Sequence, residues 1–371
     1  MKPDLAAVPN TGKKRWNSQK LCRYLLQKSE RVHYSFCTLN TCIAGVLCIA
    51  ASIALTGPAW YKRDQPDGLA RLELTEAAMG SSFSLVLFGP DRPGLESAAA
   101  AAFAEAHRLD RLLSNYLSGS EWSAMNREAA SRPVRLTPEL FALLSACLEY
   151  SRISDGAFDI TVGPLMKVWG FFKGEGSLPL PDQVTAALKH VGYRHVQLDP
   201  GLRTVRFARP NMDLDPGGIG KGYAVDRMVA VLKQAGVRIA LVSASGSSIY
   251  GLGAPPDQPQ GWPITISTPR DPSAAATHVV LKNMSISTSG SYEKFFWADG
   301  RTYSHIIDPR TGYPARGTSA VSVLAPRTLD SEAWTKPFFI NGRAWTSAHT
   351  PAGFRVFFCE DRGQAACGWL P

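Results

Sequence analysis

Residues 213–226 read DLDPGGIGKGYAVD, and this stretch decides how the surrounding chain is organised. Its closely spaced glycines allow the backbone to approach a ligand, and the helix predicted from about Lys221 to Gln234 would present free N–H groups to an anion. Lys221 adds a positive charge where a phosphate would bind. The stretch is not a Walker loop, because no Ser or Thr follows the lysine, and its GxGxG spacing is not the dinucleotide fingerprint. A tight turn has the same composition, so the loop alone leaves both interpretations open.

The patterns on both sides of this loop predict helices and strands that interleave without a βαβ rhythm. Residues 71–89 alternate like two strands joined by a turn, and residues 96–117 carry leucines at helical spacing. Thr137 followed by Pro138 is typical of a helix start. Further helices are expected over residues 181–191 and 330–342, and further strands over 205–214, 238–251 and 353–360. Because 45% of the 371 residues are hydrophobic, we expect one α+β domain over residues 66–371.

The N-terminal part of the chain differs from the rest in charge. Residues 1–40 carry a net charge of +6 out of the total of +9, which leaves about +3 for all other residues and argues against a nucleic-acid partner. Residues 41–58, TCIAGVLCIAASIALTGP, are uncharged and largely apolar. A basic stretch before an apolar run predicts an export segment, with residues 1–40 left on the cytoplasmic side.

The apolar run is about 16 residues long, shorter than the roughly 20 residues of a typical span, so a cleaved signal peptide and an uncleaved anchor both stay open. We therefore expect the domain at residues 66–371 on the periplasmic side of the inner membrane, with membrane association through residues 41–58 as an option. Cys147, Cys359 and Cys367 show no metal-binding spacing. After export, Cys359 and Cys367 could form a disulfide, and two separate thiols are the alternative.

A second polar cluster combines SISTSGSY at residues 285–292 with GRTYSHIIDPRTGYP at residues 300–314. His305 could act as a general base, Asp308 could orient it or lie near a metal, and Arg310 could clamp a phosphate. The prolines and glycines mark a turn. The alternative is a structural turn in which Asp308 and Arg310 satisfy backbone groups.

Two weaker segments complete the set. Residues 155–164, DGAFDITVGP, precede Trp169, and alone they would be interpreted as a strand with a bulge and a core tryptophan. Glu332 and Thr335 place a carboxylate and a hydroxyl on one helical turn, where they could share a hard cation. The alternative for this pair is a helix cap or a solvated face.

Together these segments have the order and spacing of the FAD:protein FMN transferases, a family also called ApbE or thiamine biosynthesis lipoprotein, which the chain resembles over residues 72–345. The strongest matches are GAFDITVGPLMKVWGF at residues 156–171, GGIGKGYAVD at 217–226 and YSHIIDPRTGYP at 303–314. The resemblance implies an ApbE-like, T-fold-related α+β catalytic domain over residues 66–371.

The resemblance also implies functional roles at matching positions. A flavin nucleotide would contact Met79, Tyr116, Ala157, Phe158, Asp159, Asp215, Lys221 and Ile307. A Mg²⁺ ion would be bound by the backbone carbonyl of Gly218 and by the side chains of Glu332 and Thr335.

The chain departs from the family pattern in two places. The family usually has Asp, three intervening residues and then Thr, whereas this chain has Glu332, places Thr335 one residue early and has Lys336 at the Thr position. Residues 243–247 read SASGS where the family often has Asn-Ala-Gly-Gly-Asp, so a carboxylate is lost. The resemblance therefore leaves the details of metal binding open.

The activity implied is the Mg²⁺-dependent transfer of FMN from FAD to a Ser or Thr hydroxyl of a target flavoprotein, with release of AMP. In this hypothesis Mg²⁺ and Lys221 neutralise the phosphates, His305 is the base, and Asp308 either orients His305 or supports the metal ligands. An exported enzyme would modify a subunit of a membrane redox complex. The alternatives are a Mg²⁺-dependent FAD pyrophosphatase giving FMN and AMP, a non-catalytic exported FAD-binding protein, and a membrane-tethered interaction protein.

Overall fold

The computed structural model describes residues 68–174, 176–271, 273–361 and 366–371, which belong to one compact unit, Arg63–Pro371. The predicted basic segment, residues 1–40, and the predicted export segment, residues 41–58, lie outside the described residues. Among the helices of the described part, none combines the length and apolarity needed to cross a bilayer. The described part mixes helices with antiparallel strands, which confirms the α+β class.

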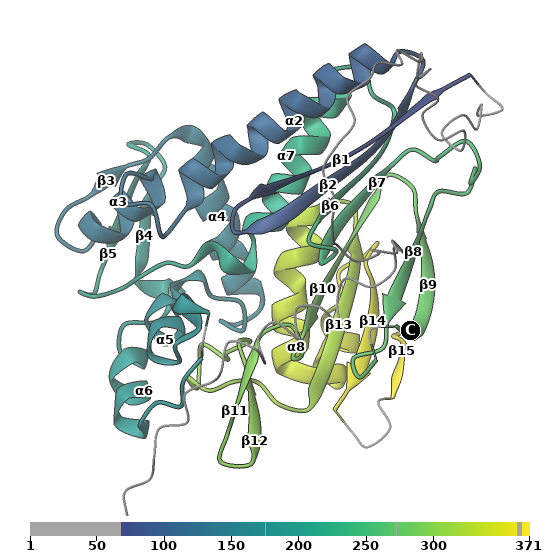
Figure 1. Cartoon of the computed structure of the whole chain (residues 1–371). Helices are drawn as coiled ribbons and strands as arrows, with labels where there is room; N and C mark the ends of the chain where they lie inside the picture. Colours follow the sequence, from purple (N-terminus) through teal and green to yellow (C-terminus); the bar gives the residue numbers. More distant parts are fainter. Residues whose placement is uncertain (1–67, 175, 272, 362–365) are drawn as a thin grey trace, which may run out of the picture. The chain divides into compact units, whose positions relative to one another are not determined.

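An eight-stranded sheet organises this unit, and its strands follow the order β1-β2-β6-β7-β10-β13-β14-β15 (Figure 1). All neighbouring strands in it run antiparallel. The strands are β1 Ala70–Ala78, β2 Ser81–Gly89, β6 Ile239–Ala244, β7 Ser248–Leu252, β10 Met284–Gly290, β13 Thr318–Ala325, β14 Arg355–Glu360 and β15 Cys367–Trp369. A disulfide joins Cys359 to Cys367 across the last two strands, which confirms that these cysteines pair.

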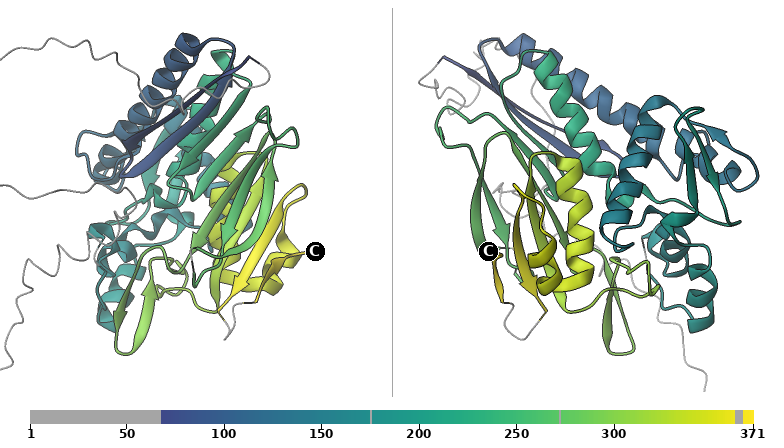
Figure 2. Two further views of the ribbon diagram at one scale, coloured as in Figure 1. Left: turned by 45° about the vertical axis from the view of Figure 1, so that its right-hand side comes forward. Right: turned by 180° about the vertical axis from the view of Figure 1, so that it is seen from behind.

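Three helices cover one face of the sheet: α2 Arg92–Leu113, α7 Gly220–Gln234 and α8 Thr328–His349. They lie next to one another in the view from behind (Figure 2). Alanines such as Ala99 and Ala102 are fully buried in α2, so its backbone can approach α7 closely, where Ala224 is also buried. The helical conformation of α8 is interrupted at Gly342.

Hydroxyl groups, rather than apolar side chains, form part of the contact between α8 and the sheet. The Oγ atoms of Ser285 and Ser287 lie 3.0 and 2.8 Å from that of Ser331. Ser289 donates to the Oγ1 of Thr335 at 2.8 Å. All five residues are buried, so these hydrogen bonds satisfy groups that would otherwise be unpaired away from water.

Two hairpins extend from this arrangement. The first consists of β8 Trp262–Ser267 and β9 Ala275–Leu281, and it packs on the sheet face opposite the helices, where the rings of Phe88 and Trp262 are 5.9 Å apart. The second consists of β11 Phe295–Ala298 and β12 Arg301–Ser304 (Figure 1). In this hairpin Phe296 stacks on Tyr303, whereas Trp297 is 69% exposed.

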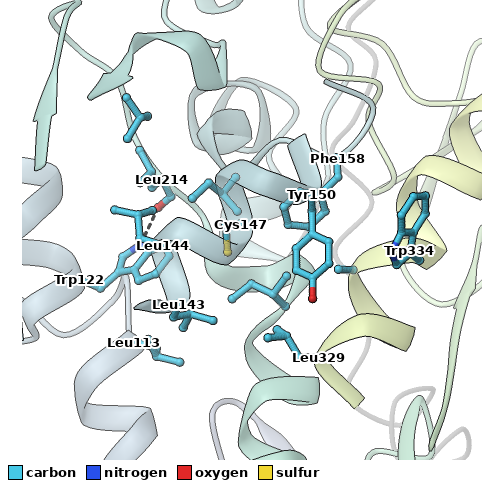
Figure 3. Close-up of a cluster of buried hydrophobic side chains, with 14 of the residues drawn as sticks. Leu113, Trp122, Leu143, Leu144, Cys147, Tyr150, Phe158, Leu214, Leu329 and Trp334 are labelled. Atoms are coloured by element: carbon cyan, nitrogen blue, oxygen red, sulfur yellow. Dashed lines mark hydrogen bonds between the residues drawn. The ribbon is translucent and has the colours of Figure 1, made fainter. Parts of the chain in front are cut away.

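A second group of elements packs beside the helical layer. It comprises α3 Glu121–Glu128, α4 Pro138–Ile153, α5 Gly163–Val168, α6 Pro181–Leu188, β3 Val134–Arg135, β4 Val196–Asp199 and β5 Thr204–Phe207. Thr137 caps α4 by accepting a hydrogen bond from Leu140 N, as its position before Pro138 predicts. In the core shown in Figure 3, Trp122 Nε1 donates to the carbonyl of Leu214 at 2.8 Å. This hydrogen bond fixes the backbone just before the glycine loop.

The structure differs from the sequence predictions in three segments. Residues 238–251 form two strands, β6 and β7, because Ser245 adopts a positive φ of 52° and turns the chain. Residues 155–164 do not form a strand with a bulge, since Asp159 caps a 3₁₀ helix, Ile160–Val162, that leads directly into α5. The strand predicted over 205–214 is confined to Thr204–Phe207.

Candidate active site

Segments far apart in the sequence meet at a cavity of about 860 Å³. This volume is within the usual range of small-molecule sites. Most of the residues singled out by the resemblance line it: Met79, Tyr116, Ala157, Phe158, Asp159, Asp215, Gly218, Lys221, His305, Ile307 and Glu332. Asp308 and Thr335 are not among the lining residues. The functional roles of all these residues stay predictions.

The glycine loop, residues 215–222, forms one wall. Asp215 accepts a hydrogen bond from Gly217 N at 2.7 Å and so caps the 3₁₀ turn Pro216–Gly218 that leads into α7. Gly222 leaves no space for a side chain, since an added Cβ would lie 2.5 Å from the Thr328 carbonyl oxygen. The glycines therefore serve two purposes, because they open the loop to the cavity and let α7 touch α8.

Segment 157–159 forms another wall of the cavity, and the carboxylate of Asp159 in it is hydrogen-bonded to neighbouring protein groups. One oxygen of Asp159 accepts from the backbone N–H and the hydroxyl of Thr161 at 2.9 and 2.7 Å. The other oxygen accepts from Tyr193 N at 2.7 Å. Burial raises the pKa of Asp159 above its usual value, and these hydrogen bonds only partly offset the rise. The segment thus presents a rigid wall built from Ala157 and Phe158.

An aromatic pair lies at the rim of the cavity. The ring of Tyr116 is 68% exposed and stacks on Phe172 with centroids 4.6 Å apart. Its hydroxyl donates to the carbonyl oxygen of Phe172 at 3.0 Å, which holds the ring in place. Removal from water raises the pKa of Tyr116, and the negative charge of Asp215 raises it further. A fixed, exposed aromatic face suits stacking against a planar ring system.

Lysines supply positive charge to the cavity. Lys221 donates from Nζ to the Oγ of Ser247 at 2.5 Å, so the altered turn at residues 245–247 contacts this lysine through a hydroxyl. Lys294 and Lys336 also line the cavity. Carboxylates line the same cavity, namely Asp110, Asp159, Asp215, Glu293 and Glu332, so an anionic ligand such as a pyrophosphate would bind at the three ammonium groups and not over the whole cavity.

His305 is oriented by a backbone carbonyl. Its Nδ1 lies 3.1 Å from the carbonyl oxygen of Lys294, and a carbonyl can only accept, so Nδ1 must carry the hydrogen. Burial lowers the pKa of His305 to about 4, and the nearby positive charges of Lys294, Lys336 and Lys221 lower it as well. At neutral pH the ring is therefore uncharged, and Nε2 holds a lone pair that can accept a proton.

Asp308 has different partners from those we expected. Its carboxylate binds Arg310 through two hydrogen bonds of 2.9 Å and also accepts from Arg310 N. The group that orients His305 is thus the Lys294 carbonyl and not Asp308. The interpretation of this segment as a structural turn describes Asp308 and Arg310 well. Trp169 Nε1 donates to the Gly312 carbonyl at 2.8 Å and connects this turn to α5.

The predicted Mg²⁺ ligands do not form a convincing metal site. Thr335 donates to the Glu332 carbonyl at 2.7 Å and accepts from Ser289, so its hydroxyl faces the sheet. The Nζ of Lys336 lies 3.1 Å from the same carbonyl, and its Cε is 3.6 Å from a Cβ built on Gly218. The described residues contain no group of three or more His, Cys, Asp or Glu side chains placed to hold a metal. Since Mg²⁺ needs several oxygen ligands and an ammonium group repels it, these residues fit the ion poorly.

Sequence reasoning missed Phe172, Lys294 and the contact of Ser247 with Lys221. Phe172 directly follows the motif at residues 156–171, and this proximity could have indicated that it lines the same site. Lys294 orients His305 through its backbone carbonyl, and this contact leaves no pattern in the sequence.

Comparisons with known proteins agree on one family. The family model described as "ApbE family" matches residues 79–356. A Salmonella typhimurium protein named FAD:protein FMN transferase is 29% identical over 332 residues, covering 87% of this chain and 94% of the relative. A Klebsiella pneumoniae protein of the same name is 31% identical, covering 79% and 85%. The solved structure of Pseudomonas stutzeri flavinyl transferase ApbE in its apo form has a TM-score of 0.73 and 31% identity, covering 81% of this chain and 95% of that one.

Proposed function

The chain belongs to the ApbE family, and on that premise we propose that it transfers FMN from FAD to a hydroxyl group of a target protein and releases AMP. The observation that carries the proposal is the meeting of the three family motifs at one cavity: the 156–171 segment, the glycine loop and the segment at 303–314 each contribute lining residues. FAD is the flavin donor in this proposal.

The reaction exchanges the phosphoanhydride bond of FAD for a phosphate ester bond to the acceptor. The hydroxyl oxygen of the acceptor attacks the FMN-side phosphorus of FAD, and a new P–O bond forms. The bond from that phosphorus to the bridging oxygen breaks, so AMP departs with the oxygen and the electron pair. The hydroxyl proton goes to a base, and no oxidant or reductant is needed.

His305 Nε2 accepts that proton in this proposal. Because the pKa of His305 is about 4, the ring is a weak base that is nonetheless fully unprotonated at neutral pH. Lys221 would bind the pyrophosphate at the start of α7, where free N–H groups add to its positive charge. Tyr116, stacked on Phe172, would pack against a ring of the bound nucleotide.

Export and the nature of the target are finer proposals. The poor fit of Gly218, Glu332 and Thr335 to Mg²⁺ means that no step here is derived through the ion. Export to the periplasmic side, by the segment at 41–58, is supported by the Cys359–Cys367 disulfide, since such bonds persist in oxidising compartments. The partner is then a flavoprotein with an acceptor Ser or Thr on that side, which we propose to be a subunit of a membrane redox complex.

The test uses the purified chain with FAD and an acceptor domain that carries a Thr, with mass spectrometry of the acceptor. A gain equal to one FMN, together with stoichiometric AMP, is expected. An acceptor with this Thr changed to Val is the control. FMN and AMP without any gain on the acceptor would show a pyrophosphatase instead, and bound FAD without turnover would show a binding protein.

A further inference from the structure

Resting on the proposed FMN transfer, we propose that the ammonium group of Lys336 takes the place of the divalent cation that the family resemblance implies. Lys336 binds the FAD pyrophosphate directly, and this chain transfers FMN without Mg²⁺. Lys336 is then a catalytic residue, since it contacts the phosphates whose bond is broken.

Lys336 lies close to cavity-lining residues of both α8 and the glycine loop. Its Nζ is 3.1 Å from the carbonyl oxygen of Glu332, one helical turn earlier in α8. Its Cε lies 3.6 Å from a Cβ built on Gly218. Lys336 therefore lies next to two of the three residues to which the resemblance assigns the metal, and it lines the same cavity.

The hydrogen bonds of Lys336 use part of its donor capacity. An ammonium group has three N–H donors, and the described contacts use one of them, toward the Glu332 carbonyl. Glu332 and Glu293 place negative charges near Lys336 and line the same cavity. The remaining donors are available to an anion that enters the cavity, and phosphate oxygens are the acceptors that a lysine point charge binds well.

The residues that a metal would need are already engaged in other contacts. The hydroxyl of Thr335 is turned away from the cavity and is held by Ser289 and by the Glu332 carbonyl. One oxygen of the Glu332 carboxylate already accepts a hydrogen bond from Gly222 N. A divalent ion placed here would meet the carboxylates of Glu332 and Glu293 but also the ammonium group of Lys336, which repels it. The ammonium group itself needs no such ligands.

The chemical consequence follows from charge. In phosphoryl transfer the cation neutralises the phosphate oxygens and the departing group, and a fixed ammonium group supplies the same type of stabilisation. Lys221 stabilises the pyrophosphate from α7, and Lys336 does so from α8. The two positive charges are close enough for each to lower the pKa of His305.

The experiment measures AMP release and acceptor flavinylation by the full chain in excess EDTA and in millimolar Mg²⁺. The wild type is expected to change by less than about twofold between the two conditions, and Lys336→Met is expected to lose about 100-fold in both. Lys336→Arg, which keeps the charge, is expected to retain more activity than Lys336→Met. The double variant Glu332→Asp/Lys336→Thr restores the family pattern and is expected to work only with Mg²⁺. Lys189→Met removes an exposed lysine outside the cavity and is the matched control.

A second readout does not depend on turnover. Mn²⁺ binding to the FAD complex, followed by paramagnetic resonance, is expected to be absent in the wild type and present in the double variant. FAD affinity in EDTA is expected to fall in Lys336→Met. Thermal unfolding of each variant shows whether it is folded.

Three outcomes would overturn the inference: loss of wild-type transfer in EDTA with recovery in Mg²⁺, Mn²⁺ bound to the wild-type FAD complex, or unchanged FAD affinity in a folded Lys336→Met variant. Absence of any AMP release by the wild type, with or without Mg²⁺, would contradict the proposed function instead. The FAD affinities and Mn²⁺ binding would still decide the role of Lys336.

Discussion

The start of α7 and residues 332–340 of α8 line the same cavity, but different contacts hold the two helix starts. At α7 the contacts are local, since Asp215 caps Gly217 two residues away. At α8 they come from a distant part of the chain, because the carboxylate of Asp226 in α7 accepts hydrogen bonds from Thr328 N and Leu329 N at 2.7 and 2.9 Å. Neighbouring residues therefore fix the conformation of the loop before α7, whereas the start of α8 is fixed by contacts with a distant part of the chain.

The two regions also differ in how closely they follow the family pattern. Residues 217–226 match it throughout, and residues 332–336 replace both the acid and the hydroxyl at the expected spacing. Because α7 and α8 touch through Gly222 and Glu332, a substitution that moves one helix also displaces the other. This difference is the basis of the proposal that the start of α7 binds the phosphates while α8 supplies an ammonium group in place of metal ligands.

The largest effect is expected from Lys221→Met, which removes the positive charge at the start of α7. We expect kcat/KM for FMN transfer to fall by about 100-fold or more, because a cation placed at the reacting phosphates is lost. Steady-state kinetics with Lys189→Met as control measures this. A loss much smaller than that of Lys336→Met would show that Lys336 contributes more to transfer than Lys221 does.

Gly222→Ala tests the contact between the two helices. The new Cβ would lie 2.5 Å from the Thr328 carbonyl oxygen and 2.8 Å from Glu332 Oε2, so the helices must move apart. We expect the free energy of unfolding in urea to fall by about 2–3 kcal/mol. Gly119→Ala is the control, because its Cβ would meet nothing within 4 Å. Equal stability of both variants would show that the helices do not depend on this contact.

Asp226→Ala removes the carboxylate that caps α8 from α7. We expect a loss of about 1–2 kcal/mol in the free energy of unfolding, because two backbone N–H groups lose their acceptor. Asp226→Asn keeps one acceptor oxygen and is expected to lose less. If both variants unfold like the wild type, the start of α8 is held by its own packing and the contrast with α7 disappears.

The smallest effect concerns pH. Protonation of His305 removes the base, so activity is lost as the pH falls through the pKa of the folded protein, which burial lowers to about 4. We expect kcat/KM to change by less than about twofold between pH 7 and pH 5, where a histidine of ordinary pKa would lose most of its unprotonated form. An acid limb near pH 6.5 would show that His305 is solvated in the active complex or is not the base.

The sequence predicted what depends on neighbouring residues. The hairpin of β1 and β2, the start of α4 at Thr137 and the helix after the glycine loop are all found as expected. Residues 238–251 were predicted as one strand because apolar alternation continues on both sides of the turn at Ser245. The hydroxyl of Thr335 faces Ser289 and the carbonyl of Lys294 faces His305, and neither contact leaves a pattern along the chain, since both arise only when distant segments pack.

The hairpin of β11 and β12 has a spectroscopic consequence. Trp297 is 69% exposed, and its strand begins directly after Lys294, whose carbonyl holds His305. The other tryptophans of the described residues are less exposed. Trp297 is therefore an intrinsic fluorophore beside the cavity, open to aqueous quenchers. A flavin absorbs where indole emits, so filling and emptying of the cavity can be followed in real time by energy transfer, without an attached dye.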